Sequence, residues 1–402
     1  MPDRNIFSRV KNIFIRLRRK MLTELTIMYL YPLIYRACSR KAVESKKIIF
    51  IESRLPVLSN SFSEVYKSLN QDTDFTLKSH FLRKTFVSDI EYTKNCIALI
   101  KDMATARCVF MDEATHIFAR IKLRPETDLV QLWHGCGAFK KFGYSVTDGK
   151  FGASQRAKTR YPVHKNYTLA TVSSEEVIPH FEEAMNLKGK EIVSATGVSR
   201  TDIFFDNAFI DFSREKLLSI LPEAKNKKII LYAPTFRGNV ESASAPDKLD
   251  ISMMQAELSD EFILLIKHHP LVKSRPSVSG TFAHDFSDKM SIEELICVSD
   301  ICISDYSSLI YEYSLLEKPM IFFAYDLKEY FDDRGFYYDY DELTPGPVFG
   351  TTEEITAYIN DLDNNFDKSR VISFKKKFMS ACDGKATERI LKRIFGENFK
   401  CQ

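Results

Sequence analysis

Imidazole and amino groups follow the apolar segment 129–132, which is typical of a buried strand. His134 comes just after this segment and lies beside two glycines that let a ligand approach the backbone. Because imidazole has a pKa of about 6.5 and accepts a proton near neutral pH, His134 is a candidate catalytic base. Lys140 and Lys141 follow a few residues later and would supply positive charge for a phosphate. A structural histidine at a strand end is the alternative interpretation.

Two more strand-like segments end in cationic or imidazole groups. Arg237 follows the strand and proline turn of KKIILYAP, and its planar fork suits a phosphate or a carboxylate. His268 and His269 follow the apolar run 263–266. Because successive side chains point in different directions, we expect only one of these histidines to face a site.

The segment 299–320 predicts a strand, a polar turn and an amphipathic helix. The apolar run 301–303 precedes Asp305, Ser307 and Ser308, which are typical N-cap residues. Free N–H groups at a helix start attract an anion, although a capped helix without a ligand is the alternative. The carboxyl ends of parallel strands line one crevice, so the convergence of this turn with Arg237 and His269 predicts a phosphate site.

The sequence lacks the motifs of several large enzyme classes. We find no GxxxxGK[ST] loop, no GxGxxG after a strand, no GxSxG elbow and no HExxH helix. The eight cysteines include no CxxC pair. We therefore expect no metal site, no disulfide and no bound cofactor. With no signal peptide in this sequence, the reducing cytoplasm is the expected compartment.

The elements that must position these groups form two alternating series of strands and helices. Strand-like runs at 47–52, 96–100, 107–111 and 128–133 begin the first series, and a second series starts at residue 227. A chain of 402 residues with 45% apolar side chains is long for one core. The prediction is an α/β protein with two domains, one over residues 46–200 and one over residues 201–402.

The N-terminal segment, residues 1–45, predicts a basic amphipathic helix. Residues 1–50 hold 12 Lys and Arg against 3 Asp and Glu, whereas the rest of the chain holds 45 against 51. This asymmetry favours an anionic membrane surface over nucleic acid as partner. Glu24 and Pro32 interrupt the apolar stretch, so it is too short for a membrane-spanning helix. A core helix with a solvated basic face is the alternative.

Six motifs stand in this order along the chain: WHGCGAFKKFG, GVSRTD, YAPTFRG, KHHP, SDICISDYSSLIYEYSLLEKPMIFFAYD and RGFYYDYDELTPGP. Together they resemble the CDP-glycerol glycerophosphotransferase family, which comprises wall teichoic acid primases and polymerases and their capsule relatives. The resemblance spans roughly residues 45–365. It implies a GT-B-like fold, with two Rossmann-like domains facing a central cleft, and peripheral attachment to the cytoplasmic face of the cell membrane.

The resemblance also implies roles for single residues. His134 matches the general base for the acceptor hydroxyl, and His269 matches the residue that contacts the donor pyrophosphate and helps CMP to leave. Glu312 stands where the family usually has Asp and suits the donor ribose. The other implied substrate-binding residues are Arg237 as a phosphate ligand, Ser307 and Ser308 at the helix start, and Asp305 at the turn.

The activity implied by the resemblance is transfer of glycerol phosphate, or a related polyol phosphate, from its CDP form to a lipid-linked or growing teichoic acid or capsule acceptor. A CDP-ribitol ribitolphosphotransferase is the close alternative. A GT-B nucleotide-sugar glycosyltransferase and a non-enzymatic membrane scaffold are alternatives of other classes. His134 beside Lys140 and Lys141 favours the phosphotransferase, because that site also binds phosphate on the acceptor side.

Overall fold

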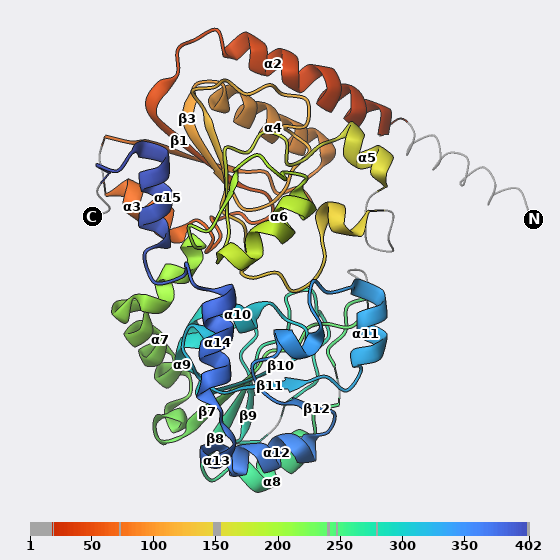
Figure 1. The fold of residues 1–402 in the computed structure, drawn as a ribbon, viewed down its shortest axis with the longest axis vertical. Coiled ribbons are helices and arrows are strands. Elements are labelled where there is room, and N and C mark those ends of the chain that lie inside the picture. Colours follow the sequence, from red (N-terminus) through yellow and green to blue (C-terminus); the bar gives the residue numbers. More distant parts are fainter. Residues whose placement is uncertain are drawn as a thin grey trace, which may run out of the picture.

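Two parallel β-sheets of six strands each form the framework of the molecule (Figure 1). The computed structural model describes residues 18, 20–71, 74–147, 154–238, 242–246, 248–278 and 280–399. We call the part built on the first sheet the N-terminal half and the part built on the second sheet the C-terminal half. The predicted α/β class with two sheets is confirmed.

The first sheet has the strand order β2-β1-β3-β4-β5-β6. Its order reverses between β1 and β3, and ligands of open parallel sheets bind at the carboxyl ends beside such a reversal. The run 96–100, predicted as a strand, instead lies inside helix α4, where apolar residues at helical spacing face the sheet. The strands are β1 (Glu44–Glu52), β2 (Thr76–Phe81), β3 (Ala106–Met111), β4 (Asp128–Gln131), β5 (Leu169–Thr171) and β6 (Val193–Ser194).

The second sheet has the order β12-β11-β10-β7-β8-β9, which is the strand order of a Rossmann fold. Its reversal lies between β7 and β10. The loops after these two strands carry Arg237 and the Ser307–Ser308 turn. The strands are β7 (Lys228–Tyr232), β8 (Phe262–Ile266), β9 (Ala283–Asp285), β10 (Ile301–Ser304), β11 (Met320–Phe323) and β12 (Val348–Phe349).

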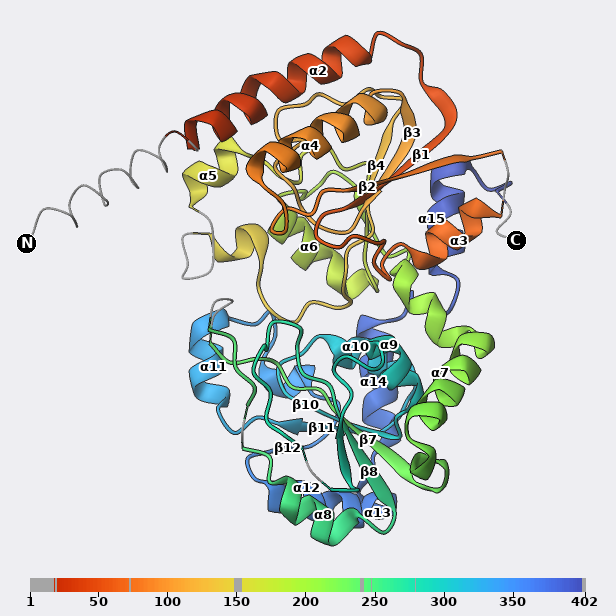
Figure 2. The same cartoon turned by 180° about the vertical axis from the view of Figure 1, so that it is seen from behind.

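Helices cover both faces of each sheet (Figures 1 and 2). The α-helices that precede the second sheet in the chain are α2 (Tyr31–Cys38), α3 (Ser63–Asn70), α4 (Asp89–Met103), α5 (Gln155–Arg160), α6 (Ile178–Met185) and α7 (Asn207–Ile220). The later ones are α8 (Ile251–Leu258), α9 (Ile292–Val298), α10 (Leu309–Ser314), α11 (Leu327–Arg334), α12 (Thr352–Asn360), α13 (Leu362–Asn365), α14 (Lys368–Phe378) and α15 (Ala386–Phe395). A π-helix, η1 (Thr26–Leu30), precedes α2, and the 3-10 turns are η2 (Gly143–Val146), η3 (Glu175–Val177), η4 (Ser199–Phe205), η5 (Pro222–Asn226) and η6 (Tyr340–Leu343).

Burial of alternate side chains along the strands explains this layering. In β1, Ile49 and Ile51 pack towards α2 and α4, whereas Ile48 and Phe50 pack towards α3 and α15. Strands buried on both faces read as continuous apolar runs, as KIIFI in β1 does. The cluster that contains Ile49 continues into the C-terminal half through α10 and α14, so the two halves share one apolar core.

Helix α15 returns to the N-terminal half at the end of the chain (Figure 1). Ile390 and Leu391 lie in the same apolar cluster as β1 and β3. The guanidinium of Arg107 in β3 donates to the Ile394 carbonyl at 3.0 Å. These residues fall within the range predicted for the C-terminal domain, yet their contacts belong to the first sheet.

The predicted basic helix at the N-terminus falls mainly on residues 1–17 and 19, which lie outside the described part of the chain. The described continuation, η1 and α2, lies beside α4 (Figure 2) and buries Tyr31 and Tyr35 against it. Met21, Leu25 and Leu33 remain largely exposed. No helix among the described residues is long and apolar enough to cross a bilayer.

Candidate active site at the junction of the two halves

The loop after β4 lies directly on the loop and helix after β10. A Cβ atom on Gly135 would lie 3.8 Å from the Ser308 hydroxyl oxygen. One on Gly137, whose φ is +64°, would overlap the ring of Tyr311 in α10 at 2.2 Å, so only glycine fits there. This close approach brings His134 from the first sheet and the Ser307–Ser308 turn from the second sheet to one place.

His134 is exposed at this junction and held through one ring nitrogen. Its Nδ1 lies 2.9 Å from the main-chain carbonyl oxygen of Asp112. A carbonyl only accepts hydrogen bonds, so Nδ1 carries the hydrogen and Nε2 of the neutral ring has a free lone pair. The ring also stacks on Trp133, with centroids 4.6 Å apart. This tautomer suits a base that takes a proton at Nε2.

A buried polar chain supports the backbone just before His134. Trp133 has a φ of +61°, a conformation rare for a bulky residue. Its N–H donates to Gln131 Oε1 at 2.9 Å, and Gln131 Nε2 donates to the Tyr167 hydroxyl at 2.9 Å. That hydroxyl lies 3.2 Å from Nδ1 of His164, whose pKa burial lowers to about 4. Sequence reasoning missed Gln131, because a polar residue in an apolar run gives no sign of its partners.

Two buried carboxylates organise the reversal point of the first sheet. Glu52, at the end of β1, accepts hydrogen bonds from the N–H groups of Arg54, Leu55 and Ser59. Asp112, after β3, accepts a 2.7 Å bond from the Ser59 hydroxyl. Burial raises the pKa of Asp112 to about 6. The loop after β1 is therefore held next to Asp112, whose carbonyl accepts the hydrogen bond from His134.

Arg237 follows the end of β7, as predicted, and there, at the reversal point of the second sheet, it pairs with two carboxylates. Its Nε and Nη2 donate to Asp326 at 2.6 and 3.0 Å, and Nη1 donates to Asp305 at 2.9 Å. Burial opposes this charge, but Asp305 and Asp326 raise the pKa of Arg237. Most of the fork is thus occupied within the protein. Its role as a phosphate ligand stays a prediction.

Asp305 is buried and connects the loops after β7 and β10. Its carboxylate accepts from the main-chain N–H groups of Thr235 and Tyr306 at 2.8 and 2.6 Å. These bonds and the pair with Arg237 shape the turn that precedes Ser307. A direct contact of Asp305 with substrate stays a prediction, since only 2% of this residue is exposed.

His269 is exposed after β8, whereas its neighbour His268 is buried, in agreement with the expectation that only one faces a site. The Leu271 N–H donates to His269 Nδ1 at 3.2 Å, so the hydrogen of the neutral ring lies on Nε2. Burial and the nearby charge of Lys140 lower the pKa of His269. His269 therefore offers an N–H donor to an anion.

Lys140 and Lys141 lie where the two halves are joined by main-chain hydrogen bonds. Lys140 forms an antiparallel bridge with Phe336, and the Lys141 N–H donates to the Gly335 carbonyl at 3.1 Å. The Lys140 ammonium lies 5.1 Å from the centre of the Tyr330 ring. Lys140 thus comes from the N-terminal half but places its charge among residues of the C-terminal half. The phosphate-binding role of both lysines stays a prediction.

The turn before α10 is more polar than the helix that follows. Ser307 Oγ accepts a 3.3 Å bond from the Leu309 N–H, and Ser308 is exposed towards Gly135. Helix α10 has only six residues, fewer than the sequence pattern predicts. Glu312 is buried in it and faces Arg200, with Oε1 3.8 Å from Arg200 Nε. Burial raises the pKa of Glu312 to about 7. Its contact with a donor ribose stays a prediction.

Arg200 belongs to the GVSRTD motif, but sequence reasoning assigned it no role. Its Nη1 donates to the His134 carbonyl oxygen at 2.6 Å, and its Nη2 donates to Glu293 Oε1 at 2.6 Å. Because Glu293 lies in α9, the arginine joins the two halves beside the candidate site. Only the fold brings these partners together, from positions far apart in the sequence.

Among the described residues, no group of three or more His, Cys, Asp or Glu side chains is arranged to hold a metal ion.

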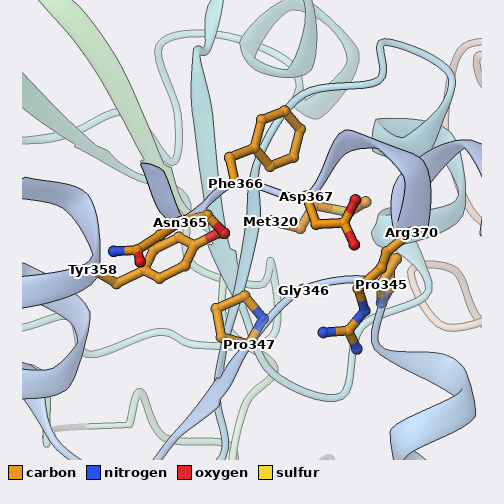
Figure 3. Close-up of a pocket in the computed structure, with 9 residues that line it drawn as sticks. All are labelled: Met320, Pro345, Gly346, Pro347, Tyr358, Asn365, Phe366, Asp367 and Arg370. Carbon is orange, nitrogen blue, oxygen red and sulfur yellow. The ribbon is translucent and has the colours of Figure 1, made fainter. Parts of the chain in front are cut away.

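A small cavity of about 90 Å³ lies at the opposite edge of the second sheet, between the start of β11 and the segment 365–370 (Figure 3). Its lining includes Met320, Tyr358 and Arg370. It lies at the amino ends of the strands and takes no part in the candidate site.

Similarity to known proteins gives this geometry a chemical context. The model of the family described as CDP-glycerol:poly(glycerophosphate) glycerophosphotransferase matches residues 33–396. The chain is 40% identical over 359 residues to the teichoic acid poly(ribitol-phosphate) polymerase of Bacillus spizizenii, covering 88% of this chain and 56% of that protein. It thus spans about half the length of that relative.

Shorter relatives match over nearly their whole length. The teichoic acid ribitol-phosphate primase of Bacillus spizizenii is 34% identical over 357 residues, which is 87% of this chain and 90% of that protein. The structure of the wall teichoic acid polymerase TagF superposes with a TM-score of 0.75 at 23% identity, covering 97% of this chain and 96% of that chain. The predicted GT-B-like fold and the predicted resemblance are both confirmed. The chain belongs to the CDP-glycerol:poly(glycerophosphate) glycerophosphotransferase family.

Proposed function

We propose that this protein transfers glycerol phosphate, or a related polyol phosphate, from a CDP-polyol to a lipid-linked or growing teichoic acid or capsule acceptor. The observation that carries the proposal is that two exposed histidines at the junction differ at Nε2, where one can accept a proton and the other can donate a hydrogen bond. His134 has a free lone pair at Nε2, whereas His269 carries a hydrogen there. Membership of the family supports a CDP-activated donor.

In the proposed reaction, His134 Nε2 takes the proton of an acceptor hydroxyl as its oxygen attacks the β-phosphorus of the donor. The bond from this phosphorus to the oxygen bridging it to the α-phosphate breaks, and CMP leaves with that oxygen and its electron pair. His269 Nε2–H donates a hydrogen bond to the developing charge. Lys140 and Lys141 add positive charge where the two halves meet, and the Ser307–Ser308 turn adds hydroxyl groups.

Identity of the donor polyol is the second part of the proposal. Glycerol phosphate fits the family description, and glycerol-phosphate primases are among the relatives, for example that of Bacillus subtilis at 28% identity. Ribitol phosphate is supported by the higher identity of several ribitol-phosphate enzymes, at 34–40%. A CDP-ribitol ribitolphosphotransferase is therefore the second candidate. A nucleotide-sugar glycosyltransferase has no comparable support among these relatives.

We also propose that the protein works at the cytoplasmic face of the cell membrane as a peripheral protein. Exposed apolar side chains follow one another along η1 and α2 and would enter the lipid interface. The loops after β1 and β2 expose Leu55, Val57 and Phe86 at the same sheet edge as His134, which suits an acceptor with an apolar part. The exposed residues along η1, α2 and the segment before them are Met21, Leu22, Leu25, Tyr29, Leu30 and Leu33.

A direct assay tests the activity. The purified protein is incubated with CDP-glycerol, CDP-ribitol or a UDP-sugar and a lipid-linked acceptor, and released nucleotide is measured. Release of CMP that depends on the acceptor would support the proposal, and the preferred CDP-polyol would identify the donor. Release of UDP without CMP would contradict the proposal and indicate a nucleotide-sugar glycosyltransferase.

Membrane attachment has its own test. Flotation with liposomes containing anionic lipid should retain the protein, and deletion of residues 1–20 should weaken retention in a salt-dependent way. Replacing Leu25 and Leu33 by Ser should weaken it at all salt concentrations. Unchanged flotation in all variants would contradict the proposed location.

A further inference from the structure

Arg200 lies where the chain passes from the N-terminal to the C-terminal half. It is in η4, and 16% of its side chain is exposed. A guanidinium removed from water is costly unless its hydrogen bonds and charge are matched. Its partners are one carbonyl from the N-terminal half and the carboxylates of Glu293 and Glu312 from the C-terminal half.

The carbonyl partner is that of His134 itself. Arg200 Nη1 holds this oxygen at 2.6 Å, while the imidazole of the same residue is held separately by the Asp112 carbonyl. One bond therefore fixes the main chain of the candidate base, and the other fixes its ring. The first of these bonds comes from a side chain that is itself anchored to α9 by Glu293.

The carboxylate partners lie on the two helices next to the candidate donor site. Glu312 lies four residues after Ser308, and α10 leads directly out of the Ser307–Ser308 turn. A displacement of α9 or α10 would thus move Arg200 and, through its Nη1, the main chain of His134. No other described side chain hydrogen-bonds both the His134 loop and α9.

We infer that Arg200 is a positioning residue that holds His134 at the correct distance from the phosphate-binding elements of the C-terminal half. This inference rests on the proposed function, because it assigns Arg200 to the same reaction. Arg200 itself does not take part in proton transfer. Its contribution is the geometry between base and donor, and a misplacement of about 1 Å costs on the order of 100-fold in rate.

Arg200→Gln tests the inference, with the nearby pair Lys216–Glu294 as a matched control. Lys216 in α7 holds Glu294 of α9 at 2.8 Å, next to Glu293, but does not contact the His134 loop. We expect Arg200→Gln to lower kcat about 100-fold while the donor Kd changes less than about threefold. Lys216→Gln breaks a partly buried pair at the same helix and should leave kcat within about twofold of wild type.

Arg200→Lys separates positioning from simple packing. A lysine ammonium can reach the His134 carbonyl or Glu293, but lacks the fork that holds both. We therefore expect Arg200→Lys to recover part of the lost kcat without a further change in donor Kd. If Arg200→Gln does not fold, Arg200→Lys and Glu293→Gln carry the test through the same comparison of kcat with donor Kd.

The outcomes distinguish the inference from the proposed function. If the wild-type protein releases no CMP with any CDP-polyol, the proposed function fails. If the wild type is active and the Arg200 variants lose donor binding in proportion to kcat, or retain full kcat, the inference is overturned. An equal loss of kcat in Lys216→Gln would also overturn it, because the effect would then follow helix packing alone.

Discussion

His134 and His269 each follow a strand of a parallel sheet, one in each half of the molecule, but hold their ring hydrogens on opposite nitrogens. Both follow a parallel strand and both are exposed at the junction. The Asp112 carbonyl accepts from His134 Nδ1, whereas the Leu271 N–H donates to His269 Nδ1. One main-chain group thus leaves Nε2 as an acceptor and the other leaves it as a donor. The backbone next to each histidine, rather than the residue type, decides between base and hydrogen-bond donor.

The supports beneath the two histidines differ as well. The His134 loop rests on a buried polar chain from Gln131 to His164 and includes the positive φ of Trp133. His269 lies in an ordinary turn and packs its ring against Phe236, with centroids 4.9 Å apart. A catalytic base must be held in one orientation by its surroundings, and more of the surrounding structure contacts the His134 loop than the His269 turn.

The largest expected effect comes from replacing His134. His134→Gln and His134→Ala should each lower kcat about 1,000-fold, because neither side chain can accept a proton at the position of Nε2. CMP release at saturating donor and acceptor measures the loss. Donor binding and the unfolding temperature should stay near the wild-type values. His284→Ala, on β9 and remote from the junction, should be fully active; a near-normal rate for His134→Gln would contradict the base assignment.

A smaller effect should follow at His269, and here the two substitutions should differ. His269→Ala removes the N–H donor and should cost about 100-fold in kcat, whereas His269→Gln keeps an N–H group and should cost about 10-fold. The same CMP assay compares them. Equal losses for Gln and Ala at His269, as expected at His134, would remove the contrast between the two residues.

The support beneath His134 should be visible in stability. Gln131→Leu leaves the Trp133 N–H without its partner and removes the hydrogen bond that the Tyr167 hydroxyl accepts, and it should lower the free energy of unfolding by about 2–3 kcal/mol. Urea unfolding measures this change. The matching substitution near His269 is Ser287→Ala, which removes the hydrogen bond that the His268 N–H donates to the Ser287 hydroxyl and should cost about 1 kcal/mol. Losses of equal size would show that the two supports do not differ.

The smallest expected effect concerns pH. Burial raises the pKa of Glu312 to about 7 and that of Asp112 to about 6, so both carboxyls bind protons more tightly in the folded than in the unfolded chain. The contribution of each group to stability is therefore complete below its unfolded pKa and is lost as pH rises through its folded pKa. Between pH 4.5 and 7, the free energy of unfolding of Glu312→Gln should change by about 1–2 kcal/mol less than that of the wild type.

Urea unfolding at several pH values checks this expectation, with Asp112→Asn as the partner from the other half. Its window should lie lower, between about pH 4 and 6, because its pKa is raised less. Identical pH profiles for wild type and both variants would contradict the raised pKa values.

The motifs alone predict which residues gather at the junction, because each stands at the end of a recognisable strand. His134, Arg237, His269 and the Ser307–Ser308 turn all lie at carboxyl ends, as expected. The partners of these residues are not predictable in this way. Asp326, which occupies the fork of Arg237, comes from a loop 89 residues away, and only the strand order places it there.

Orientation is the second limit of sequence-based prediction. Glu312 has the spacing of a residue at the site, yet it faces Arg200 in the interior because α10 is short and buried on that side. The run 96–100 is apolar enough for a strand, but the residues before and after it extend the pattern into α4. In both cases tertiary packing decides what the local pattern leaves open.

The return of α15 to the first sheet has a consequence for how the chain folds during synthesis. The Arg107–Ile394 hydrogen bond closes a loop of 287 residues, and Ile390 and Leu391 complete the apolar cluster on one face of β1 and β3. The ribosome releases the first sheet long before it releases this helix. The part of that sheet face that α15 covers must therefore stay exposed until residues 386–395 emerge. The N-terminal half is thus synthesised first but completed only after α15 is released, and a chaperone that shields an apolar sheet face should bind the nascent chain during that interval.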